Sequence, residues 1–396
     1  MNRVDHLDGT VTNHETSNAS GNGAGRETGV ALKHTVYYVQ PLIARYRIEV
    51  IAALRQRFNV KVFANSSGVE SRGFSRERPE CEEFVETPIK NVFLNKRVKV
   101  QTKVVPRIVR ERPAAVFIFG DVTYVSLWLA LIVGRVTRVP MVIHGQGLYR
   151  YEKPGLMRTL CYRAAVALSS QYVCYAEVSK RSLERIGCPP SKLTVARNSL
   201  MVERTVAPLE KTGTEQGVLF VGRLREGCNV EILIQAVEAL VHGGHCIVLH
   251  VVGDGEQRAR LQDRYAGRAH VVWHGGIFDD GEIAAISRKC RIGCYPGAAG
   301  LSVVHMFGLS LPPLVHDRLP MHMGPEPEYV EPFETGFLYA EDGGADALAA
   351  ALIEIWKLPP EVVRNTATRA FAKYQQLNSP SVGQRLADIV ARVIKA

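Results

Sequence analysis

Residues 217–255 hold the pattern that most constrains the fold: an apolar strand, a helix with one apolar stripe, and a second apolar strand. The first strand, 217–222, runs into a turn that carries Arg223, and the second, 247–252, ends at Gly253. A strand–helix–strand unit of this kind predicts a parallel sheet. Such sheets bind ligands outside the carboxyl ends of their strands, where an arginine beside a helix N-terminus suits a phosphate.

Strands and helices alternate on both sides of a polar segment, 203–216, which we interpret as the linker between two domains. We expect an N-terminal domain over 34–202, a C-terminal domain over 217–375 and a final helix within 376–396. Residues 1–33 hold too little apolar surface to offset the entropy of ordering, so the sequence predicts a disordered tail. The predicted fold class is α/β, with two Rossmann-like doubly wound domains that face a cleft.

The individual elements follow from the apolar pattern. In the N-terminal domain we expect strands at 34–40, 60–65, 114–120, 140–145 and 171–176. The helices of that domain are expected at 47–58, 98–112, 123–136 and 155–169. Further strands of the C-terminal domain are expected at 270–275, 291–296, 313–316 and 336–339.

Composition narrows the possible partners and the compartment. The chain of 396 residues has a net charge of +10, which favours phosphorylated substrates, anionic lipid or nucleic acid. Its eight cysteines form no CxxC pair and no secretory signal opens the chain, so we expect a reducing, cytoplasmic location. The longest apolar run, 122–134, is too short to span a bilayer.

The sequence lacks the motifs that define several enzyme classes. The first strand is followed by Val39-Gln40-Pro41-Leu42, with no glycine for a pyrophosphate turn. Gly253-Asp254-Gly255 lacks the third glycine of a dinucleotide site, because position 258 is Arg. The sequence has no Walker lysine motif, zinc-ligand spacing or GxSxG elbow. A dinucleotide-dependent oxidoreductase is therefore not supported.

Other segments, taken together in their order, resemble glycosyltransferase family 4, the retaining enzymes of the GT-B fold. In the second half these segments are FVGRL at 220–224, VGDG at 252–255, VWHGG at 272–276, PGAAGLS at 296–302, LP at 311–312 and GFL at 336–338. In the first half they are HGQG at 144–147 and VARNS at 195–199. The resemblance extends over about residues 34–375.

The resemblance implies that the C-terminal domain binds a nucleotide-sugar donor and that the N-terminal domain binds mainly the acceptor. Arg223, with Arg225 beside it, is expected to neutralise the donor diphosphate. Backbone amides of Gly300, Leu301 and Ser302, at the start of a helix, are expected to bind the same phosphates. No metal or other cofactor is implied.

The remaining candidate site residues follow from the same resemblance. Gly253, Gly275 and His305 are expected near the donor nucleotide, and His144 is expected to contact the donor sugar as a catalytic residue together with Arg223. Two simpler interpretations stay open. His144 could cap a buried strand, and Arg223 could be a solvated turn residue.

The sequence also departs from the family pattern. The family usually has a lysine where this chain has Cys228, and two glutamates where it has Gly297 and His305. A charge-assisted hydrogen bond contributes roughly 1.5–3 kcal/mol, so loss of the lysine predicts weaker donor binding unless Arg225 replaces it. A non-catalytic GT-B subunit that binds a nucleotide or a protein partner is the alternative.

Residues 89–113 are strongly basic and also carry apolar residues at helical spacing. We consider Lys96, Arg97, Lys99 and Lys103 as candidates for binding an anionic membrane surface. The equally weighted alternative is an ordinary surface helix whose apolar stripe faces the core. Nucleic acid is not favoured, because the segment holds a single aromatic residue for base stacking.

The sequence therefore predicts a retaining hexosyltransferase that moves a sugar from a nucleotide diphosphate donor to a hydroxyl acceptor. The acceptor could be lipid-linked, as in bacterial surface polysaccharide or glycolipid synthesis. We expect the enzyme in the cytoplasm, with peripheral association at the inner face of the plasma membrane as a further hypothesis.

Overall fold

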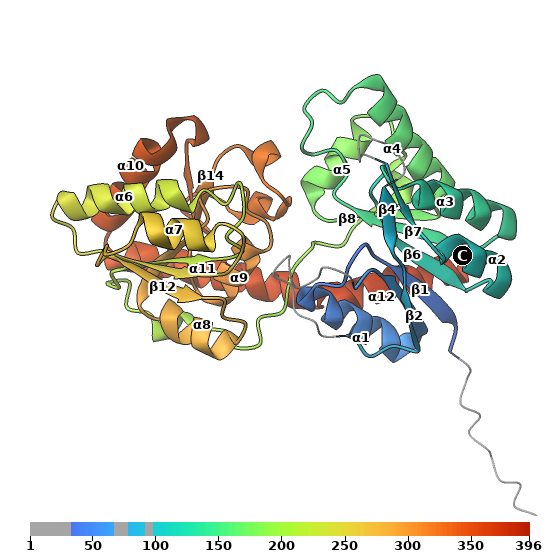
Figure 1. Ribbon diagram of the computed structural model, residues 1–396, viewed down its shortest axis with the longest axis horizontal. Helices are drawn as coiled ribbons and strands as arrows, with labels where there is room; N and C mark the ends of the chain where they lie inside the picture. Colours follow the sequence, from blue (N-terminus) through green and yellow to red (C-terminus); the bar gives the residue numbers. More distant parts are fainter. Residues whose placement is uncertain (1–32, 67–77, 92–97) are drawn as a thin grey trace, which may run out of the picture. The chain divides into compact units, whose positions relative to one another are not determined.

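The computed structural model describes residues 33–66, 78–91 and 98–396. Lys33–Ala396 forms one compact unit that contains two parallel sheets, each with helices on its faces (Figure 1). The predicted α/β fold class with two doubly wound sheets is confirmed. The predicted tail lies outside the described residues except for Lys33, and Lys96 and Arg97 also lie outside them.

The N-terminal sheet has the strand order β3-β2-β1-β6-β7-β8-β9, and all neighbouring strands pair in parallel. Its strands are β1 (Thr35–Val39), β2 (Asn59–Ala64), β3 (Glu83–Glu86), β6 (Ala115–Phe119), β7 (Met141–Gly145), β8 (Gln171–Cys174) and β9 (Leu193–Val195). Alternate residues of β1 enter different cores: Tyr37 packs in one and Tyr38 in the other. Both faces of this sheet are therefore covered, as a parallel sheet requires.

Different helices cover the two faces of the N-terminal sheet. One face carries α1 (Ile48–Arg57), preceded by the 3-10 turn η1 (Arg45–Arg47). The opposite face carries α2 (Val104–Glu111), α3 (Val125–Thr137) and α4 (Leu156–Leu168) (Figure 1). The short helix α5 (Glu177–Glu184) follows β8.

The prediction of a helix over 98–112 is wrong for the first part of that range. The antiparallel strands β4 (Ile89–Asn91) and β5 (Lys99–Gln101) form a small sheet instead, and α2 begins only at Val104. Buried Gln101 fixes β5 in place, because its side-chain amide donates to the backbone oxygen of Gln40 (2.8 Å) and its backbone N–H donates to Ser126 Oγ (3.2 Å). These tertiary contacts override the local helical pattern.

The C-terminal sheet has the strand order β12-β11-β10-β13-β14-β15, again with parallel pairs. Its strands are β10 (Gly217–Val221), β11 (Val248–Val252), β12 (Val271–Gly275), β13 (Cys290–Cys294), β14 (Pro313–His316) and β15 (Phe337–Tyr339). Its helices are α6 (Val230–His242), α7 (Arg258–Arg264), α8 (Asp280–Ser287), α9 (Ser302–Gly308) and α10 (Gly344–Lys357). Helix α6 packs against α10.

The end of the chain returns to the N-terminal sheet. Helix α11 (Pro360–Asn378) packs against α9, whereas α12 (Val382–Lys395) packs against α1. Leu386 and Val390 of α12 are fully buried in the same core as Val50 of α1. Ser381 and Gln384 form a capping box that starts α12. The last helix is thus a structural part of the N-terminal domain.

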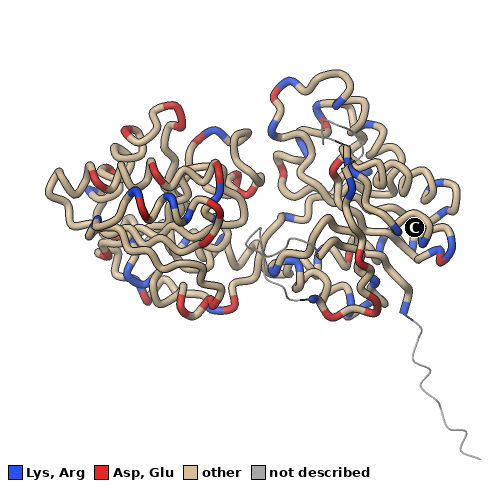
Figure 2. Tube along the Cα trace, viewed as in Figure 1, with Lys and Arg blue, Asp and Glu red and all other residues tan. Residues whose placement is uncertain are grey.

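Two surface properties bear on possible partners. Among the described helices, none combines the length and the apolar character that a bilayer-spanning segment requires. Lys and Arg are distributed over both domains rather than confined to one (Figure 2). The basic residues therefore do not mark one domain as the site of an acidic partner.

Candidate active site

A cavity of about 630 Å³ lies at the carboxyl ends of β10, β11 and β12. On the side of the C-terminal sheet it is lined by Val221, Gly222, Arg223, Val252, Gly253, Asp254, Gly276, Ile277, Phe278, Asp280, Ile283, Ser302 and His305. Its other walls come from Arg45, Tyr46, Ile48, Glu49, Leu200, Met201 and Glu203. Four of the residues expected from the sequence, namely Arg223, Gly253, Ser302 and His305, therefore open onto one cavity.

Close packing of two glycine turns shapes one wall of the cavity. A Cβ atom on Gly253 would collide with the carbonyl oxygen of Gly222, and one on Gly222 would lie 2.7 Å from the ring of Tyr295. The N–H of Gly253 donates to the carbonyl oxygen of Gly275 (2.7 Å). These contacts require glycine at both turns and leave bare backbone facing the cavity.

Arg223 places a cation on the wall beside these turns. Its side chain is 30% exposed, and its Nη2 donates to Glu256 Oε2 at 2.9 Å. The pKa of Glu256 is lowered by a hydrogen bond from the backbone amide of Glu256 and by the nearby Arg223 guanidinium. Arg223 Nε is buried and has no hydrogen-bond partner in the described parts of the chain. The guanidinium thus keeps donor capacity at the cavity wall, where it is partly shielded from solvent.

The start of α9 and the loop before it carry three expected phosphate-binding residues, of which Ser302 lines the cavity with Arg223, whereas Gly300 and Leu301 do not line it. No hydrogen-bond acceptor among the described residues pairs with the backbone amides of Gly300, Leu301 and Ser302. The Ser302 hydroxyl is buried, also without a partner there, and Ser302 lines the cavity. Free amides at the start of a helix attract anions. The arrangement can bind a phosphate group.

Arg225 and Cys228 support this loop from behind. Arg225 Nη2 donates to the carbonyl oxygen of Ala298 (2.8 Å), so its guanidinium holds the loop and does not line the cavity. Cys228 is 3% exposed, and burial raises the pKa of its thiol. A Cβ atom on Gly297 would collide with the carbonyl oxygen of Gly227. No side chain can therefore occupy position 297 without a shift of the backbone.

His305 lies deeper in the cavity wall. Its Nε2 is 3.6 Å from Asp280 Oδ1, and both side chains are only 15% exposed. Burial lowers the pKa of His305, although the Asp280 carboxylate acts in the opposite direction. The imidazole is therefore neutral near pH 7, so one ring nitrogen can donate a hydrogen bond and the other can accept one. Gly275, expected near the nucleotide, does not line the cavity, whereas its neighbour Gly276 does.

His144 does not line this cavity. Its side chain is 1% exposed at the end of β7, with its ring 4.4 Å from that of Tyr175 and 5.3 Å from that of Phe117. Burial, together with nearby Arg47, lowers the pKa of His144 well below its usual value. Neither ring nitrogen has a hydrogen-bond partner among the residues that the structure describes. The structure thus places His144 inside the N-terminal domain, apart from Arg223.

Sequence reasoning missed the residues that the N-terminal domain contributes. Arg45 Nη1 donates to the carbonyl oxygen of Phe278 (2.5 Å), and its Nη2 pairs with Glu203 (2.9 Å). Tyr46 and Glu49 line the cavity beside it. The available signal was the cationic turn that follows the first strand, Arg45-Tyr46-Arg47.

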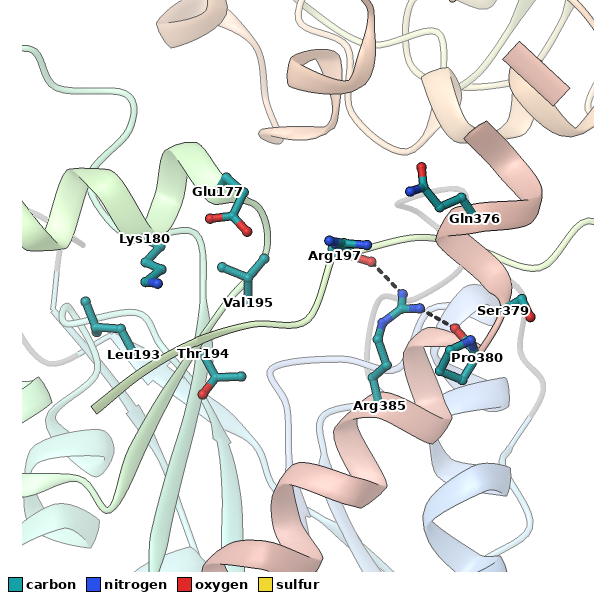
Figure 3. A pocket seen from close by; sticks show the side chains of 10 residues that line it. All are labelled: Glu177, Lys180, Leu193, Thr194, Val195, Arg197, Gln376, Ser379, Pro380 and Arg385. Carbon is teal, nitrogen blue, oxygen red and sulfur yellow. Dashed lines mark hydrogen bonds between the residues drawn. The ribbon is translucent and has the colours of Figure 1, made fainter. Parts of the chain in front are cut away.

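A second cavity, of about 410 Å³, lies between α5, β9 and the joint of α11 and α12 (Figure 3). Its most buried cation, Arg385, donates to the carbonyl oxygens of Ala196 (2.6 Å), Arg197 (2.9 Å) and Leu377 (2.8 Å) and to that of Pro380. These bonds fasten α12 to the segment after β9. Because its cation is already satisfied by backbone, this cavity is a weaker ligand site than the first.

Comparison with known proteins agrees with this geometry. Residues 202–373 match the family described as "Glycosyl transferases group 1". The curated relative "Putative colanic acid biosynthesis glycosyltransferase WcaL" of Salmonella typhimurium is 24% identical over 226 residues, which are 53% of this chain and 54% of that protein. The chain thus matches about half the length of this relative.

Solved structures share the fold over nearly the whole chain. HepE of Anabaena, crystallised with UDP and glucose, has a TM-score of 0.63 at 16% identity and covers 90% of this chain and 99% of its own. The lipopolysaccharide outer core galactosyltransferase WaaB has a TM-score of 0.58 at 14% identity, over 86% of this chain and 98% of its own. The chain therefore has the GT-B fold of glycosyltransferases, and its C-terminal domain carries the group 1 sequence pattern. The resemblance stated from the sequence is confirmed at this level.

Proposed function

We propose that this chain is a retaining glycosyltransferase that moves a hexose from a nucleotide diphosphate donor to a hydroxyl acceptor. One observation carries the proposal: the Arg223 cation opens onto the same cavity as the Ser302 hydroxyl, which has no partner in the described chain, beside the bare backbone of Gly253. The group 1 match over residues 202–373 supports it, as does the UDP bound by the similarly folded HepE.

In this mechanism the chain stabilises the leaving diphosphate. Arg223 and the amides of Gly300, Leu301 and Ser302 bind its oxygens, where negative charge develops as the bond to the sugar breaks. Gly253 and neutral His305 face the nucleoside. A guanidinium and helix-terminal amides provide this stabilisation without a requirement for a metal ion.

The acceptor and the location are also part of the proposal. The names of WcaL and WaaB support a role in the synthesis of surface polysaccharide or lipopolysaccharide. The acceptor in such a pathway is a hydroxyl group on a saccharide, including one on a lipid carrier. A cytoplasmic protein that works at the inner face of the plasma membrane fits such an acceptor.

A second candidate function, a non-catalytic GT-B subunit that binds nucleotide without turnover, is favoured by three observations. Cys228 stands where a lysine is expected and is buried. Gly297 has no room for a side chain, and His144 does not line the cavity. At each of these three positions, a group that would act on the diphosphate or the sugar is missing from the cavity.

Titration calorimetry with UDP and with GDP tests the diphosphate site. We expect one of them to bind, and Arg223→Ala to weaken that binding about 10- to 100-fold, the equivalent of a lost charge-assisted hydrogen bond. Arg260→Ala is the matched control, because Arg260 pairs with Glu231 outside the cavity. Equal affinity of the folded Arg223→Ala variant would refute the assignment.

An assay of donor hydrolysis then separates the two candidate functions. The transferase releases nucleoside diphosphate from a UDP- or GDP-sugar, slowly without acceptor and faster with one. A non-catalytic subunit binds the nucleotide with the same dependence on Arg223 but releases none from the sugar.

A further inference from the structure

Helix α4 exposes large apolar side chains to solvent. Leu156 is 76% exposed, Met157 75% and Leu160 49%, while Tyr151 in the preceding loop is 40% exposed. The helix buries only Ala165 and Val166, near its C-terminal end. Its first two turns therefore present a largely exposed apolar surface, and clustered exposure of this kind marks an interaction site.

The neighbouring helix α3 extends the apolar surface. Leu129, Ile132 and Val136 follow one another at helical spacing and are 46%, 51% and 78% exposed. Helix α3 packs against α4, and both lie on the same face of the N-terminal sheet (Figure 1). We call these α3 residues together with Tyr151, Leu156, Met157 and Leu160 the α3–α4 face.

Unpaired cations accompany the α3–α4 face. Between residues 125 and 163 the sequence has one acid, Glu152, and six exposed basic residues: Arg135, Arg138, Arg150, Lys153, Arg158 and Arg163. None of these six forms an ion pair with a carboxylate in the described ranges. The Arg158 guanidinium lies 3.9 Å from the centre of the Tyr151 ring, within the apolar surface.

The basic segment 89–113 has less exposed apolar surface in its described part, where Val109 is 52% exposed. Val104 and Ile108 of α2 are fully buried, so its apolar stripe faces the core. Arg107 and Arg110 pair with Glu111 at 3.4 and 2.8 Å. Helix α2 thus packs Val104 and Ile108 into the core, while Lys103 and Arg112 at its two ends are exposed. The membrane interpretation of segment 89–113 stays a prediction.

We infer that the α3–α4 face is a docking surface for an anionic phospholipid bilayer. The apolar side chains enter the headgroup region, and the surrounding cations contact lipid phosphates. Charge selects this occupant, because a second copy of the chain docked face to face would bring like charges together, whereas a bilayer supplies the complementary sign. The inference does not depend on sugar transfer, since this surface lies outside the cavity.

Co-sedimentation of the full chain with vesicles tests the inference. We expect binding to vesicles of equimolar phosphatidylglycerol and phosphatidylcholine, weaker binding as salt rises, and little binding to phosphatidylcholine alone. Leu156→Ser/Met157→Ser/Leu160→Ser should reduce binding about tenfold or more, since three apolar side chains leave the bilayer. Arg150→Gln/Lys153→Gln/Arg158→Gln should reduce it and flatten the salt dependence.

Lys99→Gln/Lys103→Gln is the matched control and should bind like the parent chain. The substituted residues of the apolar variant and of the basic variant are all exposed, so thermal unfolding and nucleotide binding should not change. Binding that survives both variants, equal binding to neutral vesicles, or a loss caused only by the Lys99/Lys103 variant would overturn the inference. Self-association removed by the same α4 substitutions would show that a second copy covers the face, and would also overturn it.

Discussion

In both sheets the carboxyl ends of parallel strands meet at one edge, but the two edges differ in how far a ligand can reach them. In the C-terminal sheet, the turns after β10 and β11 open onto the cavity and bring Arg223 and Gly253 to its wall. In the N-terminal sheet, His144 at the end of β7 is enclosed between Phe117 and Tyr175. Parallel topology collects polar residues at both edges, but it does not decide which edge a ligand can reach.

Burial, rather than polar pairing alone, explains the difference. At the N-terminal edge, Arg47 Nη2 donates to Tyr175 Oη (3.0 Å) and Asn198 Nδ2 donates to Glu326 Oε1 (2.5 Å). Burial raises the pKa of Glu326, which is 2% exposed. Pairing at this edge is incomplete, because neither ring nitrogen of His144 has a described partner, but His144 is only 1% exposed. At the C-terminal edge, Ser302 and part of Arg223 also have no described partner, and both residues line the cavity. A ligand site is expected where unpartnered polar groups open onto a cavity.

The largest expected effect is on the free energy of unfolding, and it appears when one arginine from each edge is replaced. Arg47→Ala should lower the free energy of unfolding by about 2–4 kcal/mol, because it leaves the buried polar groups of Tyr175 and Asn198 without their donor. Arg223→Ala should change that free energy by less than about 0.5 kcal/mol while weakening nucleotide binding. Urea unfolding of both variants measures the contrast. Equal destabilisation by the two would contradict the division of roles.

Gly253→Ala tests whether the open edge depends on close backbone packing. The new methyl group would press on the carbonyl oxygen of Gly222, so we expect a loss of about 1–3 kcal/mol in unfolding free energy and weaker nucleotide binding. Gly155→Ala is the control, because a Cβ atom there meets nothing within 4 Å. Thermal melts and calorimetry measure both effects. A Gly253→Ala variant with unchanged stability would mean that the turns pack less tightly than described.

His144→Phe tests the closed edge through pH. Because burial lowers the pKa of His144 in the folded state, the unfolded chain binds the proton more readily, and stability falls as pH drops below about 6.5. Phenylalanine should remove His144's share of this loss, at most about 1.4 kcal/mol per pH unit. Urea unfolding at pH 7 and pH 5 measures the difference. If the variant also stops donor hydrolysis at pH 7 without unfolding, His144 acts on the sugar after all.

Ser302→Ala should have the smallest effect. Removal of one hydroxyl that binds a phosphate oxygen should weaken nucleotide binding by about 0.5–1.5 kcal/mol. Stability should stay equal or rise slightly, since the buried hydroxyl has no described partner to lose. Calorimetry of the variant beside Ser287→Ala, whose hydroxyl donates to Ala284, separates the two kinds of serine. Unchanged binding would remove Ser302 from the phosphate site.

Much of the fold could be predicted from the chain alone, because strand periodicity and alternation with helices depend on local sequence. The strand–helix–strand pattern over 217–255 placed Arg223 and Gly253 at one sheet edge, and the structure has both on the cavity wall. The same reasoning failed at 98–112, where buried hydrogen bonds of Gln101 hold a strand. Arg45 and Tyr46 were missed because their part in the cavity depends on contact with the C-terminal domain.

The sequence by itself determined the two parallel sheets, the glycine turns and the cation that follows β10. Only the tertiary structure decided which apolar stripes and which polar side chains face solvent. Helices α2 and α4 both carry apolar residues beside cations, yet Ile108 is fully buried and Leu156 is 76% exposed. Periodicity defines a face of a helix, whereas its burial depends on which elements pack against it, and those elements come from distant parts of the chain.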